Sequence, residues 1–464
     1  MRGNDGHADV IVVGGGISGL ATAFDLQQRG YTVEVLEATQ RAGGVIGSRL
    51  RDGIMYETGP NSTLDTTPLI NTLLADLGIA AERVDANAVA ATRFIVRGGR
   101  LVPLPMSPQA FLTTPAFSLG AKLRLLREPF IAMTPAGVDE SIADFVRRRL
   151  GVEFLDYAID PFVAGVYAGD PEEISVGAAF PRQLAIEQKY GSLIKGQIKG
   201  ARERKANAEK SKNAAMSFSF RNGMQTLTDA LARALPRIEF GVRVERVVRN
   251  ADGSMTVEAT RGGTPIARRA RAAVIAAPAY AAAAMIAGPA PAAAQALAAI
   301  QYAPIAGVAS AYRRPGVAHS LAGFGFLVPK KEQRTILGSL FSSSMFDGRA
   351  PEGTVLLTTF AGGRRNPEIA ALSDEAVAQT VREELASIVG AVAPPLWQEV
   401  VRWPLAIPQY NLGHLDRLRY IDAAEAARPG LHFCANYRGG VSVGDCIKSA
   451  HATAENVDRA LRRG

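Results

Sequence analysis

The sequence predicts a mixed α/β and α+β protein in which one parallel β-sheet is assembled from separated parts of the chain. Two glycine-rich turns, each between a short apolar strand and a helix, occur near residues 14 and 440. Hairpin and helical patterns fill much of the chain between them. A chain of 464 residues is long enough for two or three domains. A sheet that draws on both ends of such a chain must therefore carry inserted units.

The first 37 residues follow the pattern of a strand–helix–strand unit. Asp9–Val13 is typical of a buried parallel strand, Leu20–Gln28 has helical spacing, and Thr32–Glu37 predicts a second strand. The candidate cofactor-binding residues of the first loop are Gly14, Gly15, Gly16, Ile17, Ser18 and Gly19. In such a unit the helix N-terminus binds a pyrophosphate, and the acid that ends the second strand, here Glu37, binds ribose hydroxyls. The pattern predicts a Rossmann-like dinucleotide-binding domain.

The residues after the second strand favour FAD over NAD. Arg41 can offer a charge to a phosphate, and the pair Gly43 and Gly44 lets backbone pass close to the cofactor. This extension resembles the amine-oxidase-like FAD flavoproteins. The segment that in those proteins lies beside the isoalloxazine ring is matched here by Gly59, Pro60 and Asn61. Asn61 is a candidate to orient the flavin or the substrate, and no other catalytic residue is expected.

A second strand, loop and helix occur near the C-terminus. Gly430–Ala435 predicts a strand, Asn436–Gly444 a glycine-rich loop, and Asp445–Arg462 a helix. A glycine-rich loop before a helix N-terminus again suits an anion or a flavin. We expect the backbone of Val441, Ser442 and Val443 to face the flavin.

Longer segments resemble the protoporphyrinogen oxidase family of FAD enzymes. The most specific are Tyr167–Pro171, Ser217–Leu227 and Ile407–Tyr410, while Thr358–Phe360 and Arg438–Val443 favour the mitochondrial-like branch. The matching segments span most of the chain. The resemblance implies the six-electron oxidation of protoporphyrinogen IX to protoporphyrin IX in haem biosynthesis, with FAD as hydride acceptor, O₂ as final acceptor and hydrogen peroxide as by-product.

The resemblance also implies how the substrate and the cofactor are bound. Arg93 matches a position that clamps a propionate, and Gly165 matches a position whose carbonyl accepts a pyrrole N–H. The positions that sandwich the tetrapyrrole rings are matched by Leu327, Leu340 and Phe360. Val244, at the expected backbone contact to adenine, and Trp403 are further candidate cofactor residues. Without the resemblance, a solvated hairpin arginine and ordinary core side chains would be the simpler interpretation.

We expect three units. The discontinuous FAD-binding domain is predicted to comprise residues 1–90, 216–288 and 405–464, and a sheet-containing substrate domain residues 91–106 and 289–404. Residues 107–215 are predicted to form a helical, membrane-facing insertion, because the apolar residues of Ser107–Leu150 have helical spacing.

The net charge of +8 is concentrated in one segment. Lys195–Lys212 carries seven basic and two acidic residues, a net +5. Such a run is typical of a solvated loop or of contact with anionic lipid, and without interleaved aromatic residues it does not favour nucleic acid. Two cysteines, and five histidines without ligand spacing, predict neither a disulfide framework nor a metal site.

No secretory signal opens the chain, and the prolines within the apolar segment Ala270–Ile300 argue against a spanning helix. We therefore expect a cytoplasmic protein that is peripherally associated with the inner membrane. A haem-pathway ferrochelatase and a second copy of the chain are further expected partners.

Three other functions stay open on the sequence. Coproporphyrinogen III has four propionates and would favour more cations than Arg93 alone. A flavin amine oxidase usually presents a pair of aromatic rings to an amine, and no clear pair is evident. The third alternative is a non-catalytic flavin-binding or carotenoid-desaturase-like membrane factor.

Overall fold

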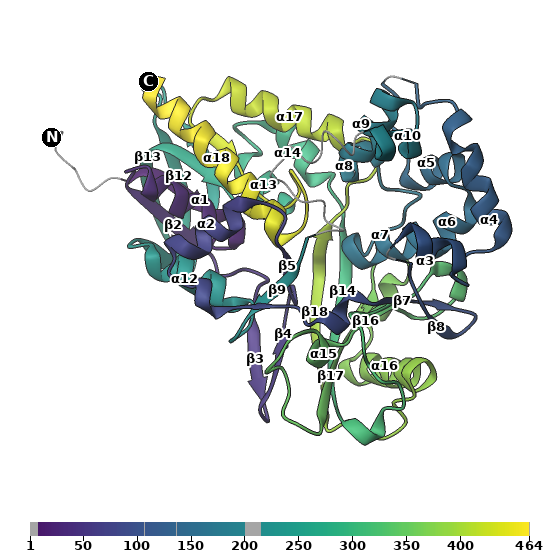
Figure 1. Ribbon diagram of the computed structural model, residues 1–464. Helices are drawn as coiled ribbons and strands as arrows, with labels where there is room; N and C mark the ends of the chain where they lie inside the picture. The colour runs from purple at the N-terminus through teal and green to yellow at the C-terminus, as the bar shows by residue number, and fades with distance from the viewer. Residues whose placement is uncertain (1–7, 106, 136, 200–214, 464) are drawn as a thin grey trace.

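Both ends of the chain contribute strands to one sheet (Figure 1). The computed structural model describes residues 8–105, 107–135, 137–199 and 215–463. The strands in spatial order are β10 (Ile238–Phe240), β2 (Val33–Glu37), β1 (Ala8–Val13), β13 (Thr264–Ile275), β12 (Met255–Arg261) and β11 (Val242–Arg249), and β19 (Leu431–Phe433) also pairs with β13. The pairs formed among β10, β2, β1, β13 and β19 are parallel. β12 pairs antiparallel with both β13 and β11.

Alternate residues of β1 enter two different cores, as a strand buried on both faces requires. Val10 and Val12 pack under α1 (Ile17–Gln28), α2 (Pro68–Asp76), α12 (Gln225–Ala234) and α18 (Val443–Arg463). Ile11 and Val13 pack with α13 (Ala279–Ile286), α14 (Pro291–Ala298) and α17 (His414–Ala427). The segment Ala270–Ile300 is thus the end of β13 followed by two short helices. Within the described ranges, no helix is both long and apolar enough to cross a membrane.

A second sheet is mostly antiparallel. Its strands in order are β18 (Trp397–Pro408), β14 (Tyr302–Arg313), β17 (Thr354–Gly362), β16 (Ile336–Leu340), β15 (Gly325–Leu327), β7 (Arg93–Arg97) and β8 (Arg100–Pro103), and β15 runs parallel to β7. One face packs against α16 (Asp374–Val389). The segment Arg93–Pro105, with Gly98 and Gly99 at its centre, predicts a hairpin, and β7 and β8 form it. Gly98 and Gly99 have φ values of +57° and +73°, as a two-residue hairpin turn requires.

One predicted pairing is wrong in part. The sequence predicts that Ile238–Val248 and Met255–Ala259 pair as two strands, but Gly241, with φ of +69°, divides the first of them into β10 and β11. β10 pairs with β2, and β11 alone pairs with β12. The left-handed glycine ends the pairing with β2 and starts β11, which still contacts β2 before it pairs with β12.

Residues 107–199 form a unit of short helices, to the right in Figure 1. The elements are α3 (Pro108–Thr113), α4 (Leu119–Arg124), η3 (Leu125–Phe130), α5 (Ile142–Arg149), α6 (Val152–Phe154), η4 (Leu155–Ile159), α7 (Asp160–Tyr167), α8 (Val176–Ala179), α9 (Pro181–Tyr190) and α10 (Leu193–Lys199). A serine hydroxyl caps the N-terminus of α3, α4, α5 and α8. Most of the basic segment Lys195–Lys212 lies outside the described residues, from position 200 on.

Smaller elements join the two large sheets. They are the hairpin β3 (Ser48–Arg51) and β4 (Ile54–Glu57), the sheet of β5 (Thr63–Leu64), β9 (Ser217–Phe220) and β6 (Arg83–Asp85), and α15 (Ser342–Met345). The buried carboxylate of Glu57 accepts a hydrogen bond of 2.8 Å from the guanidinium of Arg349, which also donates to Ser219.

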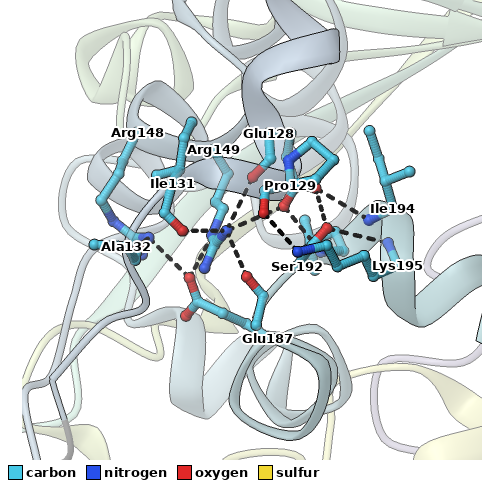
Figure 2. A network of polar contacts seen from close by, with 12 residues as sticks. Glu128, Pro129, Ile131, Ala132, Arg148, Arg149, Glu187, Ser192, Ile194 and Lys195 are labelled. Carbon is cyan, nitrogen blue, oxygen red and sulfur yellow. Dashed lines mark hydrogen bonds and ion pairs between the residues drawn. The ribbon is translucent and has the colours of Figure 1, made fainter.

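A buried charge network holds the helical unit together (Figure 2). The guanidinium of Arg149, on α5, is fully buried between the carboxylates of Glu128 and Glu187. Glu128 also accepts hydrogen bonds from the Leu193 and Ile194 amides at 2.9 and 3.2 Å, so that it caps α10. One arginine therefore links α5, η3, α9 and, through Glu128, α10.

We expect Arg149→Met to lower the free energy of unfolding by about 3–5 kcal/mol, because it leaves the buried carboxylate of Glu128 without a cation among the described residues and leaves Glu187 with Arg148 alone. The matched control is Arg147→Ala, which removes exposed ion pairs to Asp144 and Glu172 and should cost less than about 1 kcal/mol. Urea denaturation measures both. Equal losses in the two variants would contradict the role given to the network.

Candidate active site

The glycines of the first loop are set by close backbone contacts. A Cβ on Gly14 would lie 2.9 Å from the carbonyl oxygen of Ala276, and the φ of Gly14 is +111°. A Cβ on Gly19 would lie 2.0 Å from the carbonyl oxygen of Gly14. At Gly16, by contrast, a Cβ would meet no described atom within 4 Å. Gly14 and Gly19 are thus needed by the fold, whereas the glycine at position 16 is needed only if something approaches the backbone there.

The N-terminus of α1 is built to bind an anion. Gly16 is its N-cap and no side chain caps it, and the first turn carries no acid. The N–H groups of Ser18 and Gly19 in this first turn therefore keep their donor capacity, next to the positive end of the helix dipole. The buried carboxylate of Glu37 holds the loop in place, because it accepts hydrogen bonds from the Gly15 and Thr39 amides at 2.6 and 2.7 Å. These features fit the pyrophosphate and ribose of a dinucleotide.

The segment after β2 lies against the first loop. The amide of Gly43 donates to the carbonyl of Gly15 at 2.7 Å, and a Cβ on Gly44 would lie 3.2 Å from the Cα of Gly16. The Arg41 guanidinium donates to the carbonyls of Ala42, Gly44 and Ile46 at 3.0, 2.7 and 2.8 Å. Arg41 thus shapes its own loop, and its contact to a phosphate stays a prediction.

Residues 58–61 join this loop to the second sheet. Gly59 is required, because a Cβ there would lie 2.1 Å from the carbonyl oxygen of Val45. Trp403, on β18, donates from Nε1 to the carbonyl of Thr58 at 2.8 Å. Asn61 borders a small cavity that is also lined by Tyr56, Glu57, Ser342, Met345, Phe346, Arg349, Leu356 and Met55. The structure thus places Asn61 and Trp403 at the boundary between the two sheets.

The C-terminal loop reaches the same region. Ser442 caps α18, since its hydroxyl lies 2.6 Å from the Asp445 carboxylate and accepts the Asp445 amide at 3.2 Å. Val441 packs against the helical unit. A Cβ on Gly444 would lie 3.3 Å from Oγ1 of Thr66, a few residues after Asn61. The start of α18 and the segment after Pro60 are therefore neighbours.

Val244 is buried in β11, where its register with β12 shifts between Val244 and Arg246. Such a bulge interrupts the ladder of backbone hydrogen bonds and is a common way to re-aim backbone groups at a site. The bulge supports the prediction that the backbone of Val244 contacts adenine, which stays a proposal.

The predicted substrate residues lie on one face of the second sheet. In its register, Gly325 lies opposite Arg93 and Leu340, and Gly338 lies opposite Leu327 and Phe360. Because residues two apart along a strand share a face, Arg93, Leu327, Leu340 and Phe360 form one surface, which we call the substrate face. All four are half-buried, whereas the opposite face packs under α16.

Glycines leave room for two side chains of the substrate face. The ring of Phe360 comes within 3.8 Å of a Cβ position on Gly307, and Leu327 within 3.2 Å of one on Gly338. Helix α7 approaches from the other side, since a Cβ on Gly165 would lie 2.7 Å from Cδ2 of Leu327. The result is an apolar surface bounded by α7.

Arg93 is the unsatisfied charge of the substrate face. Its guanidinium lies 5.1 Å from the ring centroid of Phe324, and burial lowers the pKa of Arg93. Across the described ranges, the guanidinium of Arg93 has neither an ion pair nor a hydrogen-bond partner, and only its backbone carbonyl accepts a hydrogen bond, from the Leu104 amide. Arg97, on the same strand, is bound to Glu153 at 2.8 Å. A half-buried cation without a counter-ion favours an anionic ligand.

Sequence reasoning missed two features of the site. The buried Glu57–Arg349 pair joins segments 292 residues apart, and no local pattern indicates such a pairing. Tyr410, buried beside the C-terminal loop, belongs to the segment Ile407–Tyr410, whose family resemblance is the one signal that could have pointed to it.

Comparison with known proteins agrees with this geometry. Residues 17–458 match the family model of the flavin-containing amine oxidoreductases. Protoporphyrinogen oxidase 2 of Arabidopsis thaliana is 34% identical, with 97% of this chain and 93% of that protein covered. The chain belongs to the flavin-containing amine oxidoreductase family, in its protoporphyrinogen oxidase branch. It is an FAD-dependent oxidoreductase.

Two further relatives bear on fold and substrate. The coproporphyrinogen III oxidase of Bacillus subtilis is 28% identical over 98% of both chains. A crystal structure of a candidate protoporphyrinogen oxidase from an Exiguobacterium species superimposes with a TM-score of 0.80 at 24% identity, covering 98% of both chains. The superposition shows that the fold is shared.

We expect Gly16→Ala to abolish FAD binding while the apoprotein loses less than about 1 kcal/mol, because the new methyl group meets no protein atom but stands where a phosphate would approach. Gly14→Ala should instead destabilise the apoprotein by at least about 1–2 kcal/mol through its left-handed backbone. Flavin absorbance and urea denaturation separate the two effects. Normal FAD content in Gly16→Ala would contradict the assignment of this loop.

Proposed function

We propose that this protein oxidises protoporphyrinogen IX to protoporphyrin IX, in three rounds that each remove two hydrogens and reduce one O₂ to hydrogen peroxide. The observation that carries the proposal is Arg93, a half-buried cation that has no counter-ion among the described residues and lies at one end of the apolar substrate face. A macrocycle with apolar rings and propionates matches both parts of this surface. The identity to protoporphyrinogen oxidases over nearly the whole chain supports the same substrate.

In the proposed mechanism, bound FAD supplies the hydride-accepting chemistry and the chain supplies binding and orientation. The α1 N-terminus with Gly14–Gly19, Glu37 and the backbone of Val441–Val443 would hold the cofactor. Arg93 would bind one propionate, while Leu327, Leu340 and Phe360 pack against the pyrrole rings. The Gly165 carbonyl would accept a pyrrole N–H. Holding the substrate in one orientation is then the main contribution of the protein to the rate.

We expect Arg93→Ala to raise KM for protoporphyrinogen about 10- to 100-fold with FAD content unchanged, because a hydrogen bond to a charged group contributes about 1.5–3 kcal/mol. The matched control is Arg100→Ala, an exposed arginine of the same hairpin, which should behave like the wild type. Aerobic turnover is measured by porphyrin fluorescence. A wild-type protein that binds FAD but leaves protoporphyrinogen unchanged would refute the proposal.

Coproporphyrinogen III is the second candidate substrate, since the Bacillus subtilis relative is named for its oxidation. Four propionates would favour several free cations, but Arg97, the other arginine of β7, is bound to Glu153. An amine substrate fits less well, because Phe360 takes part in no aromatic pair within the described part of the chain. The ratio of turnover with the two porphyrinogens distinguishes the first two functions.

We also propose the three-part division of the chain, with residues 107–215 as a membrane-facing unit. The described residues of this unit expose large apolar side chains on contacting elements: Leu119 and Leu123 on α4, Leu126 and Phe130 on η3, and Ile198 on α10, between 55% and 87% exposed. Arg127, Lys195 and Lys199 are exposed on the same elements. Apolar and basic side chains together favour an anionic lipid surface, which would also suit an apolar product. A ferrochelatase partner and a homodimer stay predictions.

We expect the triple variant Leu123→Ser, Leu126→Ser and Phe130→Ser to bind vesicles of phosphatidylglycerol more than about tenfold more weakly, because these side chains would no longer enter the apolar region. The control variant is Leu50→Ser with Val392→Ser, which removes equally exposed side chains elsewhere. Sedimentation with vesicles measures both. Equal binding of the two variants would remove the membrane-facing assignment, without affecting the proposed reaction.

A further inference from the structure

Tyr410 lies where the second sheet, the helical unit and the C-terminal loop meet. It follows β18 by two residues and is 2% exposed. Its ring stacks on the imidazole of His414, with centroids 4.2 Å apart, and contacts the ring of Tyr167 at the end of α7, with centroids 5.7 Å apart. One side chain therefore touches α17 and α7, the helix that carries Gly165.

The hydroxyl of Tyr410 closes a turn of the C-terminal loop. It donates to the carbonyl of Asn436 at 2.7 Å and accepts the Gly440 amide at 3.0 Å. Gly439 and Gly440 have φ values of +81° and +122°, which allow the sharp turn between the two contacts. Residues 436–440 are thus held at both ends immediately before Val441.

The backbone around Tyr410 binds the helical unit. The Ser175 amide donates to the carbonyl of Tyr410 at 2.9 Å. The side chain of Gln409, 1% exposed, donates from Nε2 to the carbonyl of Tyr167 at 2.8 Å. The distance between the C-terminal loop and α7, which carries Gly165, is therefore fixed through two adjacent residues.

His414 supports the same loop a second time. Its Nε2 lies 2.9 Å from the carbonyl of Tyr437, and burial lowers the pKa of His414 to about 4. The imidazole is therefore neutral near pH 7, and the nitrogen that faces the carbonyl carries the proton. Stacking on Tyr410 keeps the ring in this orientation.

We propose that Tyr410 is a positioning residue for the flavin: its hydroxyl fixes the 436–440 turn and thereby the backbone of Val441–Val443 against the cofactor, at a set distance from α7. The inference rests on the proposed assignment of Val441–Val443 to the flavin. A tyrosine that only filled the core would not need the hydroxyl, since its ring already packs on His414 and Tyr167.

Tyr410→Phe tests the proposal, because it keeps the ring and removes both hydrogen bonds. We expect FAD to bind the apoprotein about 5- to 10-fold more weakly, as the loss of one or two hydrogen bonds implies. The midpoint potential and the visible absorption of the bound flavin should shift as well. Tyr437→Phe is the matched control: this tyrosine is also buried in the loop, but its hydroxyl has no hydrogen-bond partner in the described part of the chain, so we expect wild-type values.

Two outcomes would overturn the proposal. In the first, Tyr410→Phe has a lower melting temperature but unchanged FAD affinity, potential and spectrum, which means that Tyr410 is purely structural. In the second, the Gly440 amide of the wild-type apoprotein exchanges its hydrogen as fast as it would in an unfolded chain, which means that the hydroxyl does not hold the turn. This measurement needs no variant and therefore tests the proposal even if Tyr410→Phe does not fold. In either case, oxidation of protoporphyrinogen by the wild-type protein still supports the proposed function. If the wild-type protein bound no FAD, the proposed function and the role proposed for Tyr410 would both be wrong.

Discussion

The parallel pairing of β13 with β1 on one side and β19 on the other is the constraint on which the site depends. It aligns Val13, Ile275 and Phe433, the last residues of three strands from distant parts of the chain. The loops that follow parallel strands emerge at the same edge of a sheet. The glycine loop after β1, Glu37 at the end of β2 and the C-terminal loop after β19 therefore meet at one edge, although more than 400 residues separate the first from the last.

The second constraint is the seating of the helical unit on the second sheet. Among the described residues, five ion pairs cross this boundary: Glu153 with Arg97, Asp156 with Lys331, Asp160 with Arg365, Asp170 with Lys330, and Glu173 with Arg364. All the acids belong to one unit and all the bases to the other. The Asp160–Arg365 pair is 6% exposed on both sides, and burial raises the pKa of Asp160 while the guanidinium opposes that shift. Since Asp160 begins α7, this pair sets where Gly165 lies over Leu327 and hence the width of the proposed substrate site.

Much of the fold follows from local patterns in the sequence. The β1–α1–β2 unit, the hairpin turn at Gly98 and Gly99, and the helix Asp374–Val389 were predictable, because glycine turns and 3.6-residue periodicity act over short distances. The division of the strand at Gly241 was not predicted, since the pattern does not indicate to which neighbour each half pairs. The four residues of the substrate face were predicted from the family resemblance. That they lie on one face follows only from the register of β7, β15, β16 and β17.

The sequence by itself determined which residues form the glycine loops, where many of the strands and helices lie, and that the chain resembles flavin enzymes. The tertiary structure alone decided that Arg93 has no counter-ion among the described residues while Arg97 has one, and that the hydroxyl of Tyr410 closes the cofactor loop. Local patterns specify elements because the hydrogen bonds and turns that build them link near neighbours. The pairing of a charge or a hydroxyl depends on which distant atoms reach it, and this is fixed only when the sheets and helices pack.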